Sequence, residues 1–148
     1  MITFCKVNDP YGCLSNFSKH PIVFDKLIYP TSEHLYQSMK FQDSKIRELI
    51  RTSKSPFKAA YLGRTTPNIV PNWDNIKIDV MYKVCMLKLE QHPIVRETLL
   101  STGNQEIWEY SNKDRFWGSG PDFSGRNELG KVWMRIRDEL HKKDSFKI

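Results

Sequence analysis

Hydrophobic positions recur every three or four residues over much of this chain, the spacing of helices that bury one face. Together with capping residues and prolines, this spacing predicts six helices: from Thr31 or Ser32 to Phe41, from Asp43 or Ser44 onward, from Pro56 to Gly63, from about Trp73 to Gln91, from Pro93 to about Thr102, and from Asn127 to about Lys143. Three short runs, residues 2–7, 21–25 and 105–110, alternate or are apolar enough to predict strands. The prediction is an α+β protein, mostly helical with a few short strands.

The pattern shows no internal repeat, no low-complexity linker and no break in composition. We therefore expect one domain over residues 1–148, with a frayed tail from Asp144 onward. A chain of 148 residues with 39% hydrophobic and 12% aromatic residues is long enough to bury a packed core without covalent cross-links.

The three cysteines, Cys5, Cys13 and Cys85, form no C-x-x-C pair, and the four histidines show no ligand spacing. A disulfide framework and a zinc site are therefore not expected, and free thiols suit a reducing compartment. The start of the chain lacks the basic and apolar regions of a signal peptide, and no apolar run approaches the ~20 residues that cross a bilayer. We expect a cytoplasmic protein with no membrane partner and no metal.

Lysine and arginine number 23 against 17 acidic residues, a formal net charge of +6. A basic surface attracts phosphates, from a dinucleotide to a nucleic acid. The cations are spread over the predicted helices and form no basic tail, so the charge permits a nucleic-acid partner without requiring one.

Polar residues with chemical potential line up on the helix that begins at Thr31 or Ser32. At about 100° per residue, Glu33, Gln37 and Lys40 lie at roughly 0°, 40° and 340°, on one narrow stripe. An acid, an amide and an amine are groups that can break and form bonds at a sugar carbon. The alternative is an ordinary surface helix with a polar face toward solvent.

Two further segments carry more glycine and polar character than folding requires. In the first, Gly12 allows close backbone approach beside the polar and aromatic groups of Tyr11, Ser15, Asn16 and Phe17, which suits a flat heterocycle.

The second segment, residues 111–130, has four glycines running into the last helix and could cradle a phosphate. It lacks the spacing of a Walker A loop and of a dinucleotide fingerprint. Phe116 and Trp117 are costly to expose in a mobile loop, so we expect this segment to be ordered. Trp73, which core packing also explains, and Arg64, which could equally bind the preceding helix end, are lesser candidates.

Taken together, these segments resemble one known family. The chain contains Y-G-x-L-S-N-F, Y-P-T-S-E-H-x-x-Q-x-x-K-F, A-x-x-x-G-R, N-W followed by M, and D-x-F-W-G-x-G followed by G-x-N-x-L-G-x-x-x-M-x-x-R. In this order, from Phe4 to about Arg137, they resemble the NADAR family. Trp133 stands where the family often has leucine, a departure that suggests altered packing.

The resemblance implies an N-glycosidase that needs no cofactor. Its substrate would be ADP-ribose attached to guanine, with ADP-ribosylated nucleic acid as the partner, or a ribosylamine-type intermediate of riboflavin synthesis. Carried over by position, the implied catalytic residues are Glu33, Lys40 and Asp114. The implied and candidate substrate-binding residues are Tyr11, Gly12, Ser15, Asn16, Phe17, Gln37, Arg64, Trp73, Trp117, Gly118, Gly120 and Asn127.

The expected chemistry uses Lys40 as a nucleophile on the anomeric carbon, Glu33 as acid or base, and Asp114 to orient a ribose hydroxyl or act as a second carboxylate. The glycine loop and the start of the Asn127 helix would hold the diphosphate. Direct hydrolysis between two carboxylates, with Lys40 only electrostatic, stays open. So does a non-catalytic module that binds ADP-ribose or nucleic acid. A site of this kind requires the Glu33 stripe and the Asp114–Trp117 segment to meet in one cleft.

Overall fold

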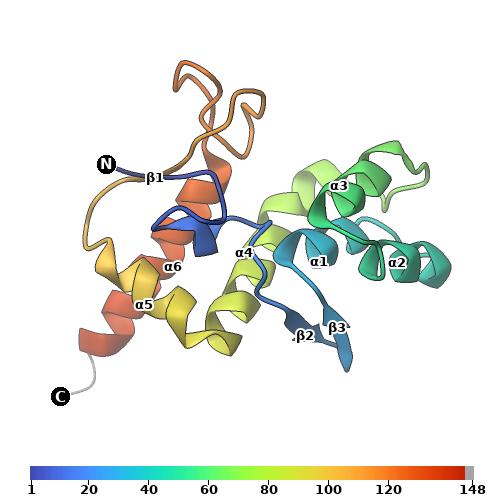
Figure 1. Cartoon of the computed structure of the whole chain (residues 1–148), viewed down its shortest axis with the longest axis horizontal. Coiled ribbons are helices and arrows are strands. Elements are labelled where there is room, and N and C mark those ends of the chain that lie inside the picture. The colour runs from blue at the N-terminus through green and yellow to red at the C-terminus, as the bar shows by residue number, and fades with distance from the viewer. Residues whose placement is uncertain (146–148) are drawn as a thin grey trace. The chain divides into compact units, whose positions relative to one another are not determined.

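The computed structural model describes residues 1–145, which fold as two compact units: residues 1–15 together with 93–145, and Asn16–His92. Short strands and predominant helices confirm the predicted α+β class (Figure 1). Each unit has its own buried residues and is described by itself. That the whole chain acts as one domain stays a prediction.

The first unit contains β1 (Ile2–Phe4), a 3-10 turn at Gly12–Leu14, α5 (Pro93–Ser101), β4 (Ile107–Glu109) and α6 (Glu128–Ser145). β1 and β4 pair in parallel, with Ile2 opposite Ile107. α6 packs on β4, and its fully buried Trp133 donates its indole N–H to the carbonyl of Leu14 at 3.0 Å. The indole therefore serves packing in this unit, in line with the packing role expected for it.

The second unit contains β2 (Ile22–Phe24), β3 (Leu27–Tyr29), α1 (Ser32–Ser38), α2 (Ser44–Arg51), α3 (Pro56–Thr65) and α4 (Trp73–Gln91). β2 and β3 form an antiparallel hairpin, and α1 packs against α2, α3 and α4. Phe41, Ile50 and Ala59 form a buried cluster with Ile46 and Leu62 packed against it.

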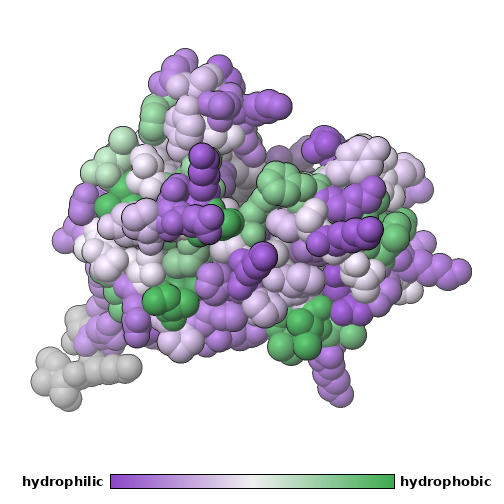
Figure 2. Space-filling view, in the orientation of Figure 1, coloured by the Kyte–Doolittle hydropathy of each residue, from purple (hydrophilic) through white to green (hydrophobic). Residues whose placement is uncertain are grey.

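The hairpin leaves hydrophobic side chains in solvent. Val23, Leu27 and Ile28 are 52%, 42% and 59% exposed. Figure 2 shows green side chains gathered where Figure 1 places β2 and β3. The sequence predicted a strand at 21–25 and missed its partner at Leu27–Tyr29, because the turn between them, Asp25–Lys26, has positive φ at two non-glycine residues.

Local capping signals located most helix starts. The side chain of Asp43 accepts N–H groups of Lys45 and Ile46, and that of Ser55 accepts the N–H of Lys58, with Pro56 in the first turn. α4 has the predicted bounds, and α5 ends one residue before Thr102.

Helix ends were predicted less well. α3 continues two residues past Gly63 and ends at Thr65. Gly63 does not end the helix; the side chain of Gln37 packs against it. α6 includes Asp144 and Ser145, so the predicted tail was wrong there, and its remainder, 146–148, lies outside the described residues.

Candidate active site on α1 and its surroundings

Every residue of α1 is buried, from Ser32 to Ser38. Thr31 caps the helix by accepting the N–H of His34 at 3.2 Å, and the extended backbone at Thr31 suits the residue that follows Pro30 and begins a helix. An ordinary surface helix would expose its polar stripe, whereas Glu33 and Gln37 are 9% and 7% exposed. The surface-helix alternative is therefore wrong for these two side chains.

Glu33 and Gln37 are joined side chain to side chain, as their spacing of four residues predicts. Gln37 Nε2 donates to Glu33 Oε1 at 2.7 Å, and the N–H of Glu33 donates to the carbonyl of Asn16 at 3.0 Å. Gly63 on α3 makes room for this pair, since a Cβ at position 63 would lie 1.9 Å from Gln37 Oε1. The missing side chain at Gly63 thus fixes where the amide, and through it the carboxylate, can lie.

Lys40 lies beyond the end of α1, on a turn in which its N–H donates to the carbonyl of Gln37 at 3.2 Å. The prediction that the helix carries the lysine was wrong, because the chain leaves the helix after Ser38 and passes to the buried Phe41. The ammonium lies 5.7 Å from the ring centroid of Tyr36.

Burial lowers the pKa of Lys40 below its ordinary value of 10.5, and the charges of Lys77 and Arg64 lower it further, against the opposing effect of Glu33. A lysine in this environment holds a larger neutral fraction at a given pH than one in water. The neutral amine is the nucleophilic form.

Two aromatic rings pack in sequence beside Lys40: Tyr36 lies next to the ammonium, and Trp73 lies next to Tyr36. Tyr36 is 4% exposed, and its ring centroid lies 5.4 Å from that of Trp73, which is 6% exposed at the first position of α4. Tyr36 was not predicted as a site residue, although it precedes Lys40 by four positions, a spacing that could have revealed it. Trp73 lies beside the candidate site and is mostly buried, as packing requires.

Buried polar atoms without a hydrogen-bond partner gather in this region of the described chain. They are Asn16 Oδ1, Ser32 Oγ and Gln37 Oε1, with one further case, Arg137 Nε, in the other unit. Such atoms are uncommon in folded proteins and each calls for a reason. The three atoms beside Glu33 can be satisfied by a buried water or by a polar group of a bound molecule.

In the other unit, the segment between β4 and α6 is ordered by its own hydrogen bonds, as expected. Asp114 Oδ1 accepts the N–H groups of Phe116 and Trp117 at 2.9 and 2.7 Å. The Phe116 ring meets Trp117 edge-on at 4.8 Å, and Arg126 lies 4.6 Å over Phe116. Asp114 thus holds its own loop through one carboxylate oxygen, while its predicted catalytic role stays a prediction.

The start of α6 differs from the expectation of a phosphate cradle. The N–H groups of Asn127, Glu128 and Leu129 donate to the carbonyls of Gly118, Phe116 and Trp117. The Asn127 side chain accepts from the N–H of Glu109 and donates to the carbonyl of Ile107, so it binds β4. These three helix-end amides are occupied by the loop and are not open to a diphosphate in this structure.

The remaining predicted residues divide between the units. Asn16, Phe17 and Arg64 lie in the unit of Glu33 and Lys40. Tyr11, Gly12, Ser15, Trp117, Gly118 and Gly120 lie in the unit of Asp114. Gly12 is required for packing, since a Cβ there would lie 2.2 Å from the carbonyl oxygen of Val7. The predicted meeting of the Glu33 stripe with the Asp114–Trp117 segment stays a prediction.

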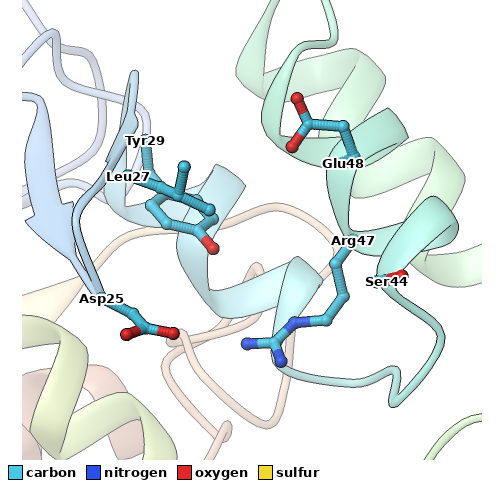
Figure 3. A pocket seen from close by; sticks show the side chains of 6 residues that line it. All are labelled: Asp25, Leu27, Tyr29, Ser44, Arg47 and Glu48. Carbon is cyan, nitrogen blue, oxygen red and sulfur yellow. The ribbon is translucent and has the colours of Figure 1, made fainter.

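A separate pocket of about 240 Å³ is formed by the β2–β3 hairpin and α2. Figure 3 shows its lining: Asp25, Leu27 and Tyr29 from the hairpin side, and Ser44, Arg47 and Glu48 from α2. It contains none of the residues predicted from the sequence, and it is smaller than the ~300–1,000 Å³ usual for ligand sites. We assign it no ligand.

Within residues 1–145, no helix is both long and apolar enough to span a bilayer. The same part of the chain contains no cluster of three or more His, Cys, Asp or Glu side chains that could hold a metal ion.

A mostly helical α+β protein with a buried carboxylate beside a half-buried lysine fits the class of enzymes that cleave glycosidic bonds. Comparison with known proteins gives the family: the NADAR domain model matches residues 3–141, and the chain belongs to the NADAR family. The predicted resemblance is confirmed.

Similar proteins cover nearly the whole chain. N-glycosidase YbiA of Escherichia coli (strain K12) is 40% identical over 95% of this chain and 88% of its own length. N-glycosidase Npun_R5314 of Nostoc punctiforme is 41% identical over 94% of this chain and 92% of its own length. The NMR structure of E. coli YbiA superposes with a TM-score of 0.90 at 38% identity, over 99% of this chain and 88% of that one. These relatives support a hydrolase of the N-glycosidase type.

A riboflavin biosynthesis protein of Vibrio vulnificus is also similar, at 36% identity over 94% of this chain and 38% of its own length. The family thus includes chains in which a region like this one forms part of a longer protein.

Proposed function

We propose that this protein is an N-glycosidase that releases ADP-ribose from guanine bases of nucleic acid. The observation that carries the proposal is the pairing of Lys40 with Glu33. Lys40 is half-buried, and burial lowers its pKa. Glu33 is buried, interacts electrostatically with Lys40 and is held in place by a hydrogen bond from Gln37. The named N-glycosidases among its relatives support the reaction class. The net charge of +6 supports a substrate rich in phosphate.

In the proposed reaction the neutral Lys40 Nζ attacks the anomeric carbon of the ribose. The C–N bond to the exocyclic amine of guanine breaks, and Glu33 gives that nitrogen a proton, so that guanine leaves with an intact amino group. The proton lost by Nζ passes to the ring oxygen as the bond between this oxygen and the anomeric carbon breaks, which opens the ribose and leaves an iminium between its anomeric carbon and the lysine. Water, deprotonated by the Glu33 carboxylate, adds to this carbon. Glu33 then returns a proton to Nζ and takes the hydroxyl proton as the C–N bond breaks, which frees the neutral lysine amine and an aldehyde that recloses as ADP-ribose.

Asp114 belongs to the proposal as the group that orients a ribose hydroxyl, a role that rests on the sequence motif. Because Asp114 Oδ1 already accepts two backbone N–H groups, the other oxygen is the one that would face a substrate. Direct hydrolysis by two carboxylates is the competing mechanism, and it predicts no bond to Lys40.

The decisive experiment incubates the protein with an oligonucleotide ADP-ribosylated at guanine and follows free ADP-ribose. Borohydride added during turnover should reduce the iminium and leave a stable adduct on Lys40, located by mass spectrometry of peptides. Lys40→Met should lose both the adduct and the release, whereas Lys83→Met, which changes an exposed lysine of α4, should keep both. Release of ADP-ribose without any adduct would refute the covalent step and favour direct hydrolysis.

The pH dependence provides a second test of Lys40. The proposed step needs a neutral Lys40 and a protonated Glu33, so kcat/KM should follow a bell-shaped pH profile. Since burial lowers the pKa of Lys40, the fall at the alkaline side should begin below pH 10.5. Glu33→Gln should lower the rate by about 10²–10⁴-fold. Equal release by this variant and the parent would show that the chemistry is incidental, and binding without release by the parent would indicate a module that only recognises ADP-ribose.

A second substrate has support from a specific relative, the riboflavin biosynthesis protein of V. vulnificus. A ribosylamine-type intermediate would present the same anomeric carbon and nitrogen to Lys40. Parallel assays with such a ribosylamine and with the oligonucleotide decide between them: the proposal requires the higher kcat/KM on the oligonucleotide.

A further inference from the structure

The outer face of α3 exposes two aromatic side chains one helical turn apart. Phe57 is 73% and Tyr61 48% exposed, and their spacing of four residues places them on the same face of the helix. The ring of Phe17 meets that of Phe57 edge-on, with centroids 4.7 Å apart and an interplanar angle of 89°. Large aromatic groups exposed together usually mark a binding surface.

Cations accompany these rings. Lys58 Nζ lies 4.9 Å and Arg64 Cζ 5.8 Å from the ring centroid of Tyr61. Lys54 is exposed immediately before the helix, and the sequence of α3, Pro56–Thr65, contains no acidic residue. The charge of this surface therefore complements a polyanion.

The surface adjoins the candidate active site. Gly63 of the same helix packs on Gln37, and Phe17 follows Asn16, whose carbonyl accepts the N–H of Glu33. A strand of nucleic acid with its modified base near Glu33 would therefore have its neighbouring nucleotides within reach of α3.

We propose that Phe17, Phe57 and Tyr61, with Lys54, Lys58 and Arg64, form an aromatic-basic surface that binds single-stranded nucleic acid and stacks the bases flanking the modified guanine. This inference rests on the proposed function for the identity of the modified base. Aromatic faces stack on any unpaired base, and neighbouring cations neutralise the backbone phosphates, which is how single strands are bound without sequence preference. A protein partner would also use exposed rings, but the three cations favour the nucleic acid.

The test measures binding of unmodified single-stranded DNA and RNA, each about ten nucleotides long, by fluorescence anisotropy at low salt. Stacking predicts that Phe57→Ala and Tyr61→Ala each weaken binding by about 5- to 150-fold. Tyr61→Phe keeps the ring and should retain most of the affinity. Ile94→Ala, which removes a 53% exposed hydrophobic side chain from α5, is the matched control and should bind like the parent.

Two further measurements separate stacking from charge and single strands from duplexes. The plot of log K against log salt concentration has a negative slope. Lys58→Gln should make this slope less steep by about 0.7, the value for one lost phosphate contact on a single strand. A duplex of the same sequence should bind more weakly than the single strand, because its bases are already stacked.

The outcomes distinguish this inference from the proposed function. Binding that depends on Phe57 and Tyr61, without release of ADP-ribose, would support the surface and refute the function. Release of ADP-ribose with unchanged single-strand affinity in the Phe57→Ala/Tyr61→Ala variant would support the function and refute the surface. An unchanged affinity accompanied by altered self-association in analytical ultracentrifugation would also overturn the inference and assign the rings to a protein contact.

Discussion

Replacing Gly63 by alanine should disturb the candidate active site on α1 without changing any residue that is proposed to react. The new Cβ would lie 1.9 Å from Oε1 and 2.6 Å from Cδ of Gln37, distances at which the amide must move. Gln37 is 7% exposed and donates to Glu33 at 2.7 Å, so any move of the amide breaks that hydrogen bond.

The expected change in the free energy of unfolding combines two costs and one gain. Overpacking costs about 1–3 kcal/mol, and loss of a hydrogen bond to a carboxylate costs about 1.5–3 kcal/mol. Alanine in place of glycine in a helix interior returns about 1 kcal/mol. The net loss of about 1.5–5 kcal/mol corresponds to a fall in Tm of about 3–20 °C for a chain of this size.

Activity should fall further than stability accounts for. Displacement of a catalytic group by about 1 Å can cost about 100-fold in rate, so kcat of Gly63→Ala should fall by about that factor at a temperature where the variant is folded. Thermal unfolding and steady-state release of ADP-ribose measure the two effects.

The Gln37→Ala background supplies the control. In this background only the Cβ of residue 37 remains close to the new Cβ, at 3.2 Å, so Gly63→Ala should cost much less than in the parent chain, with helix propensity offsetting up to about 1 kcal/mol. If Gly63→Ala raises the Tm of the parent chain and leaves kcat intact, the packing argument for this pair is refuted.

Three other predictions concern single side chains in the two units. Burial lowers the pKa of His34 below 6.5, so near pH 6 the unfolded chain takes up a proton on this residue more readily than the native state does. The free energy of unfolding should therefore decline as pH falls below 6.5, and His34→Gln should flatten the matching decline in Tm. Asp114→Asn keeps an acceptor for the two loop N–H groups, so it should lower release of ADP-ribose and leave Tm nearly unchanged. Asp114→Ala removes the acceptor and should also cost about 1–3 kcal/mol in thermal unfolding; equal Tm values for the two variants would contradict the loop role. Trp73→Ala should cost about 3–5 kcal/mol and Trp73→Phe much less, because the buried ring packs on Tyr36; a stable Trp73→Ala protein in urea titration would contradict that packing.

Tertiary structure changed the interpretation of several sequence signals. Helical spacing places Leu49 on the same face of α2 as Ile46 and Ile50, yet Leu49 is 56% exposed while Ile50 is fully buried. Short helices contact their neighbours over a narrow stripe, so periodicity alone does not tell which hydrophobic position is covered.

The sequence by itself determined where most helices begin and which family the chain belongs to. A cap such as Asp43 or Ser55 acts within three residues of itself, so its effect is visible in the local sequence. The acid–amide pair of Glu33 and Gln37 was likewise predictable, because four residues of helix suffice to bring the two side chains together.

Only the tertiary structure decided that Lys40 leaves the helix, that Gly63 is a packing site for Gln37, and that β1 pairs with β4. These features depend on residues between about 25 and 105 positions away in the chain, whose approach is set by the burial of the whole unit. Burial is also what lowers the pKa of Lys40 and turns a common residue type into a candidate nucleophile.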